Sequence, residues 1–370
     1  MKIDDKTSHN SPSLRFPEFT GEWEKYKIED ITDAVSSGKS KNHFSNGEYN
    51  LYGSTGIIGR TDKALYDGKL VLVARVGANA GFLQIINEPC GITDNTLILK
   101  PKGIDAFYLY YFLQHFNLNR LIFGSGQPLI TGGMLKKVKV SLGTISEQSK
   151  IVKFLSLLDE RIAVQSRLIE DLKKLRCAIV EKMFKQSKAN GRLGDFIEQV
   201  SVRNKNGLYS NVLSVSNKQG FVKQSEQFED RTVASEDTSN YKIVKRNNFA
   251  YNPARINVGS IARLTKFDVG IVSPMYVCFR TKASIIPEYM EAFFTSQQFF
   301  YEMMKRLEGS VRLCLSYEGL CNIPVYITDM NKQIAMGQNI SLILSKIGLE
   351  IEYLGRLHQQ KQYLLRKMFI

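Results

Sequence analysis

The sequence predicts an α+β protein with two tandem, pseudo-repeated α/β domains, each followed by one long α-helix. First, "EKMF" at 181–184 and "RKMF" at 366–369 lie 185 positions apart, half the length of the 370-residue chain. Second, both segments end long stretches in which apolar residues recur at steps of three and four, as in helices. Third, short β-type runs separated by Gly, Asn and Asp precede each stretch, which is typical of strand-rich domains.

The internal repeat covers a whole half of the protein. The 185-residue offset holds without a gap from Val138 and Ile323 to the two Lys-Met-Phe triplets. Further toward the N-terminus the register slips, and "ARVGANAG" at 74–81 stands opposite "ARINVGSI" at 254–261, an offset of 180. Repeats of this kind indicate a repeated structural unit. We therefore expect the two halves to share one fold and to be related by a pseudo-two-fold axis.

The expected boundaries follow from these patterns. The polar start of the chain reads as a poorly ordered tail, and two aromatic segments, 107–116 and 288–304, read as one buried helix in each domain. The expected segments are a tail at 1–24, a first domain at 25–145, a central helix at 146–186, a second domain at 187–329 and a C-terminal helix at 330–370.

The two long helices carry matched polar interruptions. In steps of four and three residues, eight of ten seam positions of the first helix are apolar, which is the spacing of a coiled coil. Gln165 corresponds to Glu350, and Arg176 to Lys361. We expect an antiparallel coiled coil that places Gln165 near Lys361 and Arg176 near Glu350, because a parallel pair would bury like charges. The alternative is that each helix packs only on its own domain.

Composition restricts the class of partner. The net charge of +14 and the pI near 9.4 favour a polyanion, and nucleic acid is the first candidate. The sequence contains no run of eighteen apolar residues, so no membrane span is expected. The start of the chain lacks the apolar core of a secretory signal. The five cysteines form no C-x-x-C pair. We expect reduced thiols in a cytoplasmic protein.

Glycine-rich loops with Arg and Asn recur in both halves, for example "YGSTGIIGR", "ARVGANAG", "FGSGQPLITGG", "PARINVGS" and "EGSVRL". Gly lets a backbone approach a ligand closely, and Arg and Asn suit the edges of guanine and adenine. The same features also occur in ordinary turns. The side chains expected to contact DNA are Ser54, Arg60, Arg75, Asn79 and Gln127 in the first half, and Arg255, Asn257, Arg263 and Arg312 in the second.

Catalytic motifs are scarce. The chain contains no P-loop, no dinucleotide fingerprint, no G-x-S-x-G and no metal-type spacing of its four histidines. "YNPARI" at 251–256 shares two residues with the Asn-Pro-Pro-aromatic motif of amino-methyltransferases, but the second Pro and the aromatic residue are missing. We expect no catalytic and no metal site. The alternatives are a methyltransferase that acts alone and a scaffold that binds no DNA.

The layout resembles the specificity subunit of type I restriction-modification enzymes. The motifs that carry the resemblance are "LRFPEFTGEWEKYKIEDI" at 14–31, "GSGQPLITGGMLKKVKVSLGTISEQSKIVKFLSLLDERI" at 124–162 and a degraded counterpart at 309–347. Two departures from the family pattern are clear. Residues 142–146 replace a Pro-rich turn, and Lys332-Gln333 replaces Glu-Gln.

The resemblance implies a non-catalytic DNA-recognition subunit. Each domain would be a target-recognition domain that reads one half of a bipartite site in double-stranded DNA, and the helices would set the spacing of the half-sites. Two modification (methyltransferase) subunits would dock on this chain and carry S-adenosylmethionine for adenine methylation. Two restriction (endonuclease and translocase) subunits would bring ATP and Mg²⁺. No cofactor and no membrane contact is expected for this chain itself.

Overall fold

The computed structural model describes residues 10–41, 46–122, 128–185, 188–217, 219–224, 237–310 and 312–370. The chain divides into two compact units, each described here by itself. Unit 1 comprises Met1–Ser166 and Glu352–Ile370, and unit 2 comprises Arg167–Ile351. Among the described residues, no helix combines the length and the apolar character that a membrane span requires.

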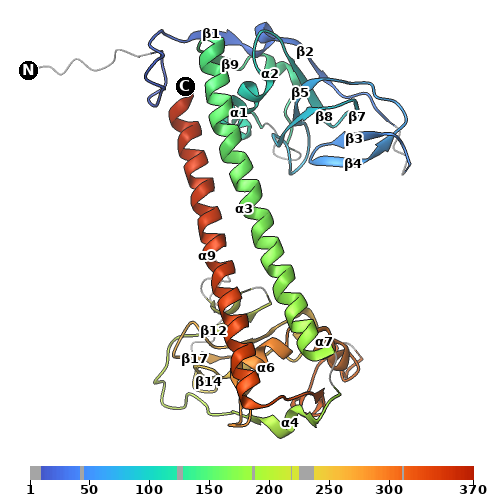
Figure 1. Ribbon diagram of the computed structural model, residues 1–370, viewed down its shortest axis with the longest axis vertical. Coiled ribbons are helices and arrows are strands. Elements are labelled where there is room, and N and C mark those ends of the chain that lie inside the picture. Colours follow the sequence, from blue (N-terminus) through green and yellow to red (C-terminus); the bar gives the residue numbers. More distant parts are fainter. Residues whose placement is uncertain are drawn as a thin grey trace, which may run out of the picture. The chain divides into compact units, whose positions relative to one another are not determined.

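Unit 1 contains a four-stranded antiparallel sheet of order β2-β8-β5-β6, a three-stranded sheet of order β4-β3-β7 and the pair β1-β9 (Figure 1). The first part of α3 (Ile145–Lys185) and the last part of α9 (Met330–Met368) belong to it. Its other elements are β1 (Glu24–Lys27), η1 (Ile28–Ile31), β2 (Thr32–Ser37), β3 (Tyr49–Gly53), β4 (Gly56–Thr61), β5 (Lys69–Ala74), β6 (Leu83–Asn87), β7 (Cys90–Ile92), β8 (Thr96–Pro101), α1 (Ala106–Phe116), η2 (Leu118–Leu121), α2 (Gly132–Lys136) and β9 (Lys139–Leu142).

The core of unit 1 lies between the sheet and α1. Strand β5 is an interior strand with an almost uninterrupted apolar sequence, and five of its six residues are buried. Such runs are typical of strands covered on both faces. Helix α1 begins at Asp105, whose carboxylate accepts a hydrogen bond from Phe107 N at 2.7 Å and so caps the helix. Its aromatic side chains then pack onto β5 and β6.

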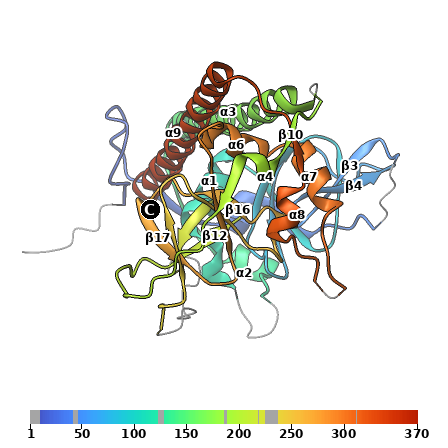
Figure 2. The ribbon, with the colours of Figure 1, turned by 90° about the horizontal axis from the view of Figure 1, so that it is seen from below.

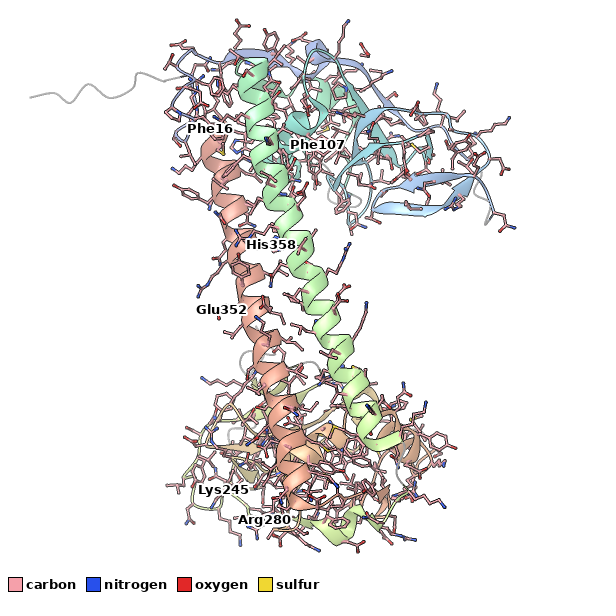
Figure 3. The ribbon with its side chains drawn as sticks, viewed as in Figure 1. Phe16, Phe107, Lys245, Arg280, Glu352 and His358 are labelled. Carbon is pink, nitrogen blue, oxygen red and sulfur yellow. The ribbon has the colours of Figure 1, made fainter. Side chains whose placement is uncertain are left out.

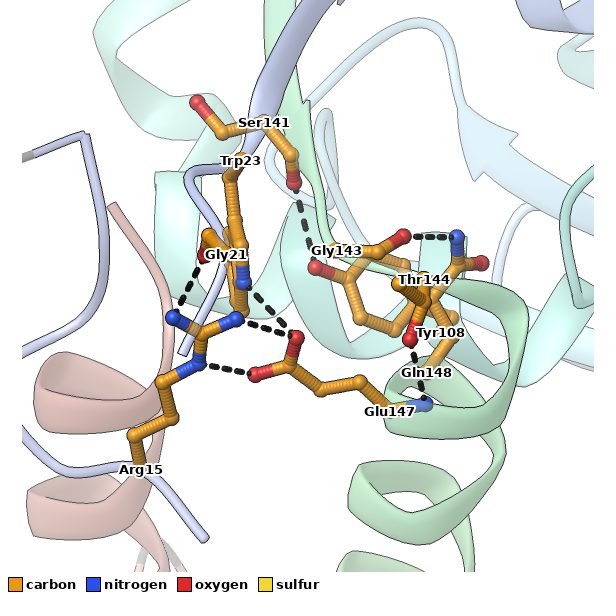
Figure 4. A network of polar contacts seen from close by, with 9 residues as sticks. All are labelled: Arg15, Gly21, Trp23, Tyr108, Ser141, Gly143, Thr144, Glu147 and Gln148. Carbon is orange, nitrogen blue, oxygen red and sulfur yellow. Dashed lines mark hydrogen bonds and ion pairs between the residues drawn. The ribbon is translucent and has the colours of Figure 1, made fainter. Parts of the chain in front are cut away.

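The segment 10–23, expected to be part of a tail, is instead packed into unit 1. Glu147 at the start of α3 is fully buried, and its carboxylate accepts bonds from Arg15 at 2.6 and 2.7 Å and from Trp23 Nε1 at 3.1 Å (Figure 4). Leu14 N also donates to Lys367 O of α9. The expectation was wrong for these residues because polar composition did not reveal the buried ion pair and the buried Trp23 that anchor them. Residues 1–9 lie outside the described ranges.

Unit 2 contains a four-stranded antiparallel sheet of order β11-β18-β15-β16 and the pairs β12-β13, β14-β17 and β10-β19. Strands β12 and β17 lie beside each other (Figure 2). The elements are β10 (Gly191–Arg192), α4 (Leu193–Phe196), β11 (Ile197–Gln199), β12 (Leu213–Ser216), β13 (Gly220–Lys223), β14 (Lys242–Lys245), β15 (Phe249–Tyr251), η3 (Ile256–Val258), β16 (Ile261–Arg263), β17 (Val269–Val272), β18 (Val277–Thr281), α6 (Pro287–Phe293), α7 (Gln297–Met304), α8 (Tyr317–Cys321) and β19 (Pro324–Val325).

The two units share one strand order. In each main sheet, the second strand of the unit pairs with the second-to-last strand, which pairs with a middle strand, which pairs with the strand that follows it. The first strand of the unit pairs with the last strand, just before the long helix. Equivalent hydrogen bonds fix the alignment: Tyr108 Oη donates to Ser141 O at 3.1 Å, and Tyr289 Oη donates to Tyr326 O at 2.9 Å. Residues of α1 therefore correspond to those of α6 at an offset of 181, while the long helices keep 185.

The aromatic segment 288–304 forms two helices rather than the single helix expected. Helix α6 ends at Phe293, and α7 begins after Ser296. The Ser296 hydroxyl accepts a hydrogen bond from Phe299 N at 3.1 Å and donates one to Phe293 O at 2.7 Å. A serine that bonds its neighbouring backbone in this way competes with helix continuation and starts a new helix. The expected helix at 107–116 is present as α1.

The helix segments of unit 1 run in opposite directions (Figure 3). Lys361 of α9 forms an ion pair with Asp159 of α3 at 2.6 Å, and Arg161 bonds Tyr353. Lys361 was expected near Gln165, which lies six residues further along α3. The expected partner of Lys361 was therefore wrong by more than one helical turn.

In unit 2 the expected pairing of Arg176 on α3 with Glu350 on α9 was also wrong. Arg176 of α3 lines a cavity with Ile340 and Leu344 of α9, six or more residues before Glu350. Glu350 forms an ion pair with Lys346 on its own helix. The physical reason is that polar seam residues can bond to neighbours on their own helix or domain, so they need not face one another. Pairing the polar interruptions of the two helices with one another predicted a helix register that differs from the observed one.

Replacing Glu147 by Ala should lower the free energy of unfolding of unit 1 by about 3 kcal/mol, because Arg15 and the Trp23 indole N–H would keep their burial without their acceptor. Urea unfolding followed by the fluorescence of Trp23, the single tryptophan, measures it. Lys153→Ala, at an exposed position of the same helix, is the control and should change stability by about 0.5 kcal/mol at most. Equal effects of the two substitutions would refute the assigned role of Glu147.

The corrected register predicts which pair of charges is coupled. A double-mutant cycle of Asp159→Asn and Lys361→Gln should give a coupling energy of about 1 kcal/mol, because the two groups form a direct and partly buried ion pair. The matched cycle of Arg176→Gln and Glu350→Gln should give nearly none. Thermal or urea unfolding of the wild type and the six variants measures both cycles, and coupling only in the second would restore the original register.

Candidate nucleic-acid interface

The loop between β5 and β6 is a compact turn. Ala74 N donates to Phe82 O at 2.8 Å, and Gly81 N donates to Ala74 O at 2.9 Å, so the loop closes on itself. Gly81 has a φ of +87°, a conformation that favours glycine. This geometry holds Asn79 at the exposed tip of the loop.

The loop between β15 and β16 in unit 2 closes at the equivalent place. Asn252 N donates to Ser260 O at 3.1 Å, the counterpart of the bond from Ala74 to Phe82. Gly259 has a φ of +88°, the counterpart of Gly81. These pairs correspond at an offset of 178, so a loop of equal length is closed at the same place in both units. The inner bonds differ, because Gly259 N donates to Ile256 O where Gly81 N donates to Ala74 O.

This alignment corrects the pairing of the two loops that was expected from the sequence. Ile130 N donates to Arg75 O, and Leu315 N donates to Pro253 O, so Arg75 corresponds to Pro253 and not to Arg255. The expected offset of 180 was wrong by two residues because "Ala-Arg" occurs at shifted places in the two copies. Asn79 and Asn257, in contrast, occupy equivalent positions. Asn79 is exposed, and Asn257 is partly exposed.

The structure brings Ser54 and Arg75 together in unit 1. Ser54, at the tip of the β3-β4 hairpin, donates through Oγ to Asn95 O at 3.3 Å, and Arg75 N donates to the same carbonyl at 2.9 Å. Gln84 Nε2 donates to Gly53 O at 2.9 Å and to Ser54 O at 3.1 Å, which fixes the hairpin tip against β6. Arg75 itself is half-buried, with one bond of 3.4 Å to Ser37 Oγ and a buried Nε that lacks a partner among the described residues.

Arg60 is not part of this group. It lies near the opposite end of the hairpin, where Nη1 donates to Glu48 O at 3.1 Å. Its side chain is exposed. Gln127 falls within residues 123–127, outside the described part of the chain.

In unit 2, Arg255 and Arg312 are exposed on two adjoining loops. The second loop is closed by reciprocal backbone bonds between Glu308 and Cys314, at 2.9 and 2.8 Å, and carries Arg312 near its tip. The bond from Leu315 N to Pro253 O joins the two loops. The two exposed arginines therefore lie on neighbouring loops.

Arg263 does not suit a role in base contact. Its Nε donates to Glu291 at 2.9 Å, its Nη1 donates to Asn247 at 3.1 Å, and it also forms an ion pair with Glu288. Its side chain is only 10% exposed. The expectation that Arg263 contacts DNA is corrected to a structural role, because two carboxylates already neutralise the guanidinium.

Some residues that were not predicted from the sequence hold the candidate DNA-contact loops in place. Asn95 and Gln84 bond the hairpin tip and the arginine loop, and Ser260 Oγ donates to Val215 O at 3.0 Å in unit 2. The turn "TDNT" at 93–96 was a usable signal for Asn95. Gln84 carried none, since one polar residue within a strand looks like any exposed strand position.

The site offers amides, guanidinium groups and backbone, which bind rather than react. Tyr251 of "YNPARI" is buried and donates to Leu315 O. The side-chain Oδ1 of Asn252 accepts a hydrogen bond from Ala254 N. Neither side chain is therefore free to bind a flipped amine. Within the described ranges, no group of three His, Cys, Asp or Glu could hold a metal ion. Contact with bases and phosphates is the chemistry that these loops support.

Comparison with known protein families gives a match in the first half of the chain. Residues 20–174 match the family described as "Type I restriction modification DNA specificity domain". A type I restriction enzyme specificity subunit from Escherichia coli is 28% identical over 112 residues, which are 30% of this chain and 28% of the relative. A putative type I specificity subunit from Mycoplasma genitalium is 28% identical over 176 residues, 45% of this chain and 46% of the relative. The matches thus span less than half the length of these relatives.

Solved structures show a likeness over nearly the whole chain. The S subunit of a type I restriction-modification system from M. genitalium has a TM-score of 0.64 at 20% identity and covers 97% of this chain and 99% of that one. A chain from a study of assembly and conformational transition in the type I system has a TM-score of 0.55 at 11% identity, with 96% and 98% covered. At these identities the likeness establishes the fold, which combines helices and sheets as in S subunits. The resemblance to type I specificity subunits is therefore confirmed.

Proposed function

We propose that this chain is the DNA specificity subunit of a type I restriction-modification complex and that each unit reads one half of a bipartite site in double-stranded DNA. The observation that carries the proposal is the turn that recurs in both units, with Asn79 and Asn257 at equivalent positions. A chain that uses one loop twice is suited to two related tasks on one ligand. The formal charge of +14 supplies the attraction to the phosphate backbone.

In the proposed complex, direct readout falls to the loop side chains. The amides of Asn79 and Asn257 suit the edge of adenine, and Arg75, Arg255 and Arg312 suit guanine or the phosphates. Ser54 and Arg60 would add contacts from the β3-β4 hairpin. The left-handed glycines let the backbone of each loop approach the DNA closely.

The long helices would act as a spacer. We propose that they form an antiparallel coiled coil that relates the two recognition domains by a pseudo-two-fold axis and so sets the distance between half-sites. Two modification subunits would dock on this chain and supply S-adenosylmethionine and adenine methylation. Two restriction subunits would supply ATP- and Mg²⁺-dependent translocation and cleavage, all in the cytoplasm. This chain would be non-catalytic.

Two other readings are less well supported. A methyltransferase that acts alone would need an open cradle, and Tyr251 and Asn252 already serve the fold. A scaffold that binds no DNA would not need Asn79 and Asn257 at equivalent places of two loops. Incubation of the purified chain with labelled S-adenosylmethionine and DNA tests the first alternative, which predicts methyl transfer without any partner subunit.

Replacing Asn79 or Asn257 by Ala should each relax recognition in one half-site only. The loss of a bidentate contact should reduce discrimination at one base pair by about 1–3 kcal/mol, roughly 5- to 150-fold. Affinities of the complex, assembled with its modification subunits, for a library of substituted sites measure this. Asn87→Ala, at the exposed far end of β6, is the matched control and should leave both halves unchanged. Two Asn variants that alter the same half would contradict the assignment.

The affinity of the chain for DNA should fall steeply with salt. Several phosphate contacts predict a slope of log affinity against log salt of about −0.9 for each contact. Replacing Arg255 or Arg312 by Gln should make that slope shallower by about one unit if the residue contacts phosphate. A flat dependence between 50 and 300 mM salt would favour the scaffold.

A further inference from the structure

Unit 2 contains a cavity of about 450 Å³ that the proposed function does not use. Its walls come from the β12-β13 turn, the start of β16, α6 and the parts of α3 and α9 that belong to unit 2. Phe221, Phe294, Ile340 and Leu344 give it a largely apolar lining. Its volume falls in the range of sites for small organic ligands, about 300–1,000 Å³.

Two cations in the wall are available to an occupant. Among the described residues, Arg176 forms no hydrogen bond or ion pair, although it lies close enough to Glu291 to favour the charged form of that carboxyl group. Lys266 bonds only a backbone carbonyl, Gln219 O, at 3.3 Å. The remaining charges, Arg263 and Glu291, are already paired with each other. Partial burial raises the pKa of the Glu291 carboxyl group.

Unit 1 shows what fills the equivalent place. There Lys361, the counterpart of Arg176, forms an ion pair with Asp159 at 2.6 Å, and its Nζ lies 5.4 Å from the centre of the Tyr111 ring. Tyr111 Oη in turn donates to Asp159 at 2.9 Å. Lys361, Asp159 and Tyr111 thus each contact the other two.

Unit 2 retains the cation and lacks its two partners. At the offset of 185 that the long helices keep, Asp159 becomes Leu344. At the offset of 181 fixed by the hydrogen bonds of Tyr108 and Tyr289, Tyr111 becomes Ala292. Leu344 and Ala292 both line the cavity, and so does Arg176. The cavity therefore adjoins the places where unit 1 has a ring and a carboxylate and unit 2 has neither.

We propose that this cavity binds a small aromatic anion whose flat ring occupies the place of the Tyr111 side chain and whose anionic group pairs with Arg176. The apolar walls of Phe294, Ile340 and Leu344 would contact the ring. Arg176 and Lys266 would neutralise the carboxylate or phosphate, the chemistry that arginine recognises best. The site is distinct from the exposed faces of Arg255 and Arg312.

The test uses 4-hydroxyphenylacetate, which joins a phenol ring to a carboxylate, and its neutral amide as matched probe. Calorimetry on the full chain should show one site for the acid with a dissociation constant below about 1 mM. The amide should bind at least tenfold more weakly, because it cannot form the charged pair. Arg176→Gln should weaken binding of the acid by at least tenfold.

Two variants locate the site. The double substitution Ala292→Tyr with Leu344→Asp rebuilds the group seen in unit 1 and should abolish binding, because the new ring takes the place of the ligand ring and the new carboxylate pairs with Arg176. Lys361→Gln, the matched change in unit 1, should leave the dissociation constant within about twofold. No binding of the acid, equal binding of acid and amide, or unchanged binding by Arg176→Gln would each overturn the proposal, and the last two comparisons do not depend on the folding of the double variant.

Discussion

Each globular core is closed by a phenylalanine at the end of a long helix. Phe369, directly after α9, packs in unit 1 against Tyr108 and Phe112, with ring centroids 5.2 and 6.4 Å apart. Phe184 of α3 packs in unit 2 against Tyr289 and Phe293 at 5.2 and 5.1 Å. Both phenylalanines are almost fully buried. Loss of such a side chain costs about 3–5 kcal/mol, so neither core is complete without its helix end.

This packing explains why the chain repeats Lys-Met-Phe at its midpoint and near its end. Unit 1 is built from residues distant in sequence because its core needs the final turn of α9. The tyrosine and the phenylalanine that pack against each of these rings are the same residue types in both units. The tyrosines, Tyr108 and Tyr289, donate hydrogen bonds to the backbone just before the long helices. At other positions the two halves of the sequence differ. Glu147 corresponds to Lys332, and Asp159 corresponds to Leu344. Packing that is kept while other residues vary suits the proposal that the two units read different halves of one DNA site.

The sequence predicted the elements better than their contacts. A regular apolar seam predicted α3 and α9 to within a few residues, because periodicity reports which face of a helix is buried. It does not report which residues face each other, and so the partners of Arg176 and Lys361 were misplaced. The role of Arg263 was also missed, since its two carboxylates lie 25 and 28 residues away along the chain. Asn79 and Asn257 were selected by composition, and only backbone hydrogen bonds revealed that they are equivalent.

The most direct test of the proposed function is a map of methylated adenines across the genome of cells that contain the modification subunits, with and without this chain. The proposal predicts a bipartite motif, two short sequences separated by a fixed number of unspecified base pairs, that is methylated only when the chain is present. Exchange of the loop 75–82 for that of a relative should then alter one half of the motif and leave the other half and the spacing unchanged. Identical methylation in the two strains, or a change in both halves at once, would contradict it.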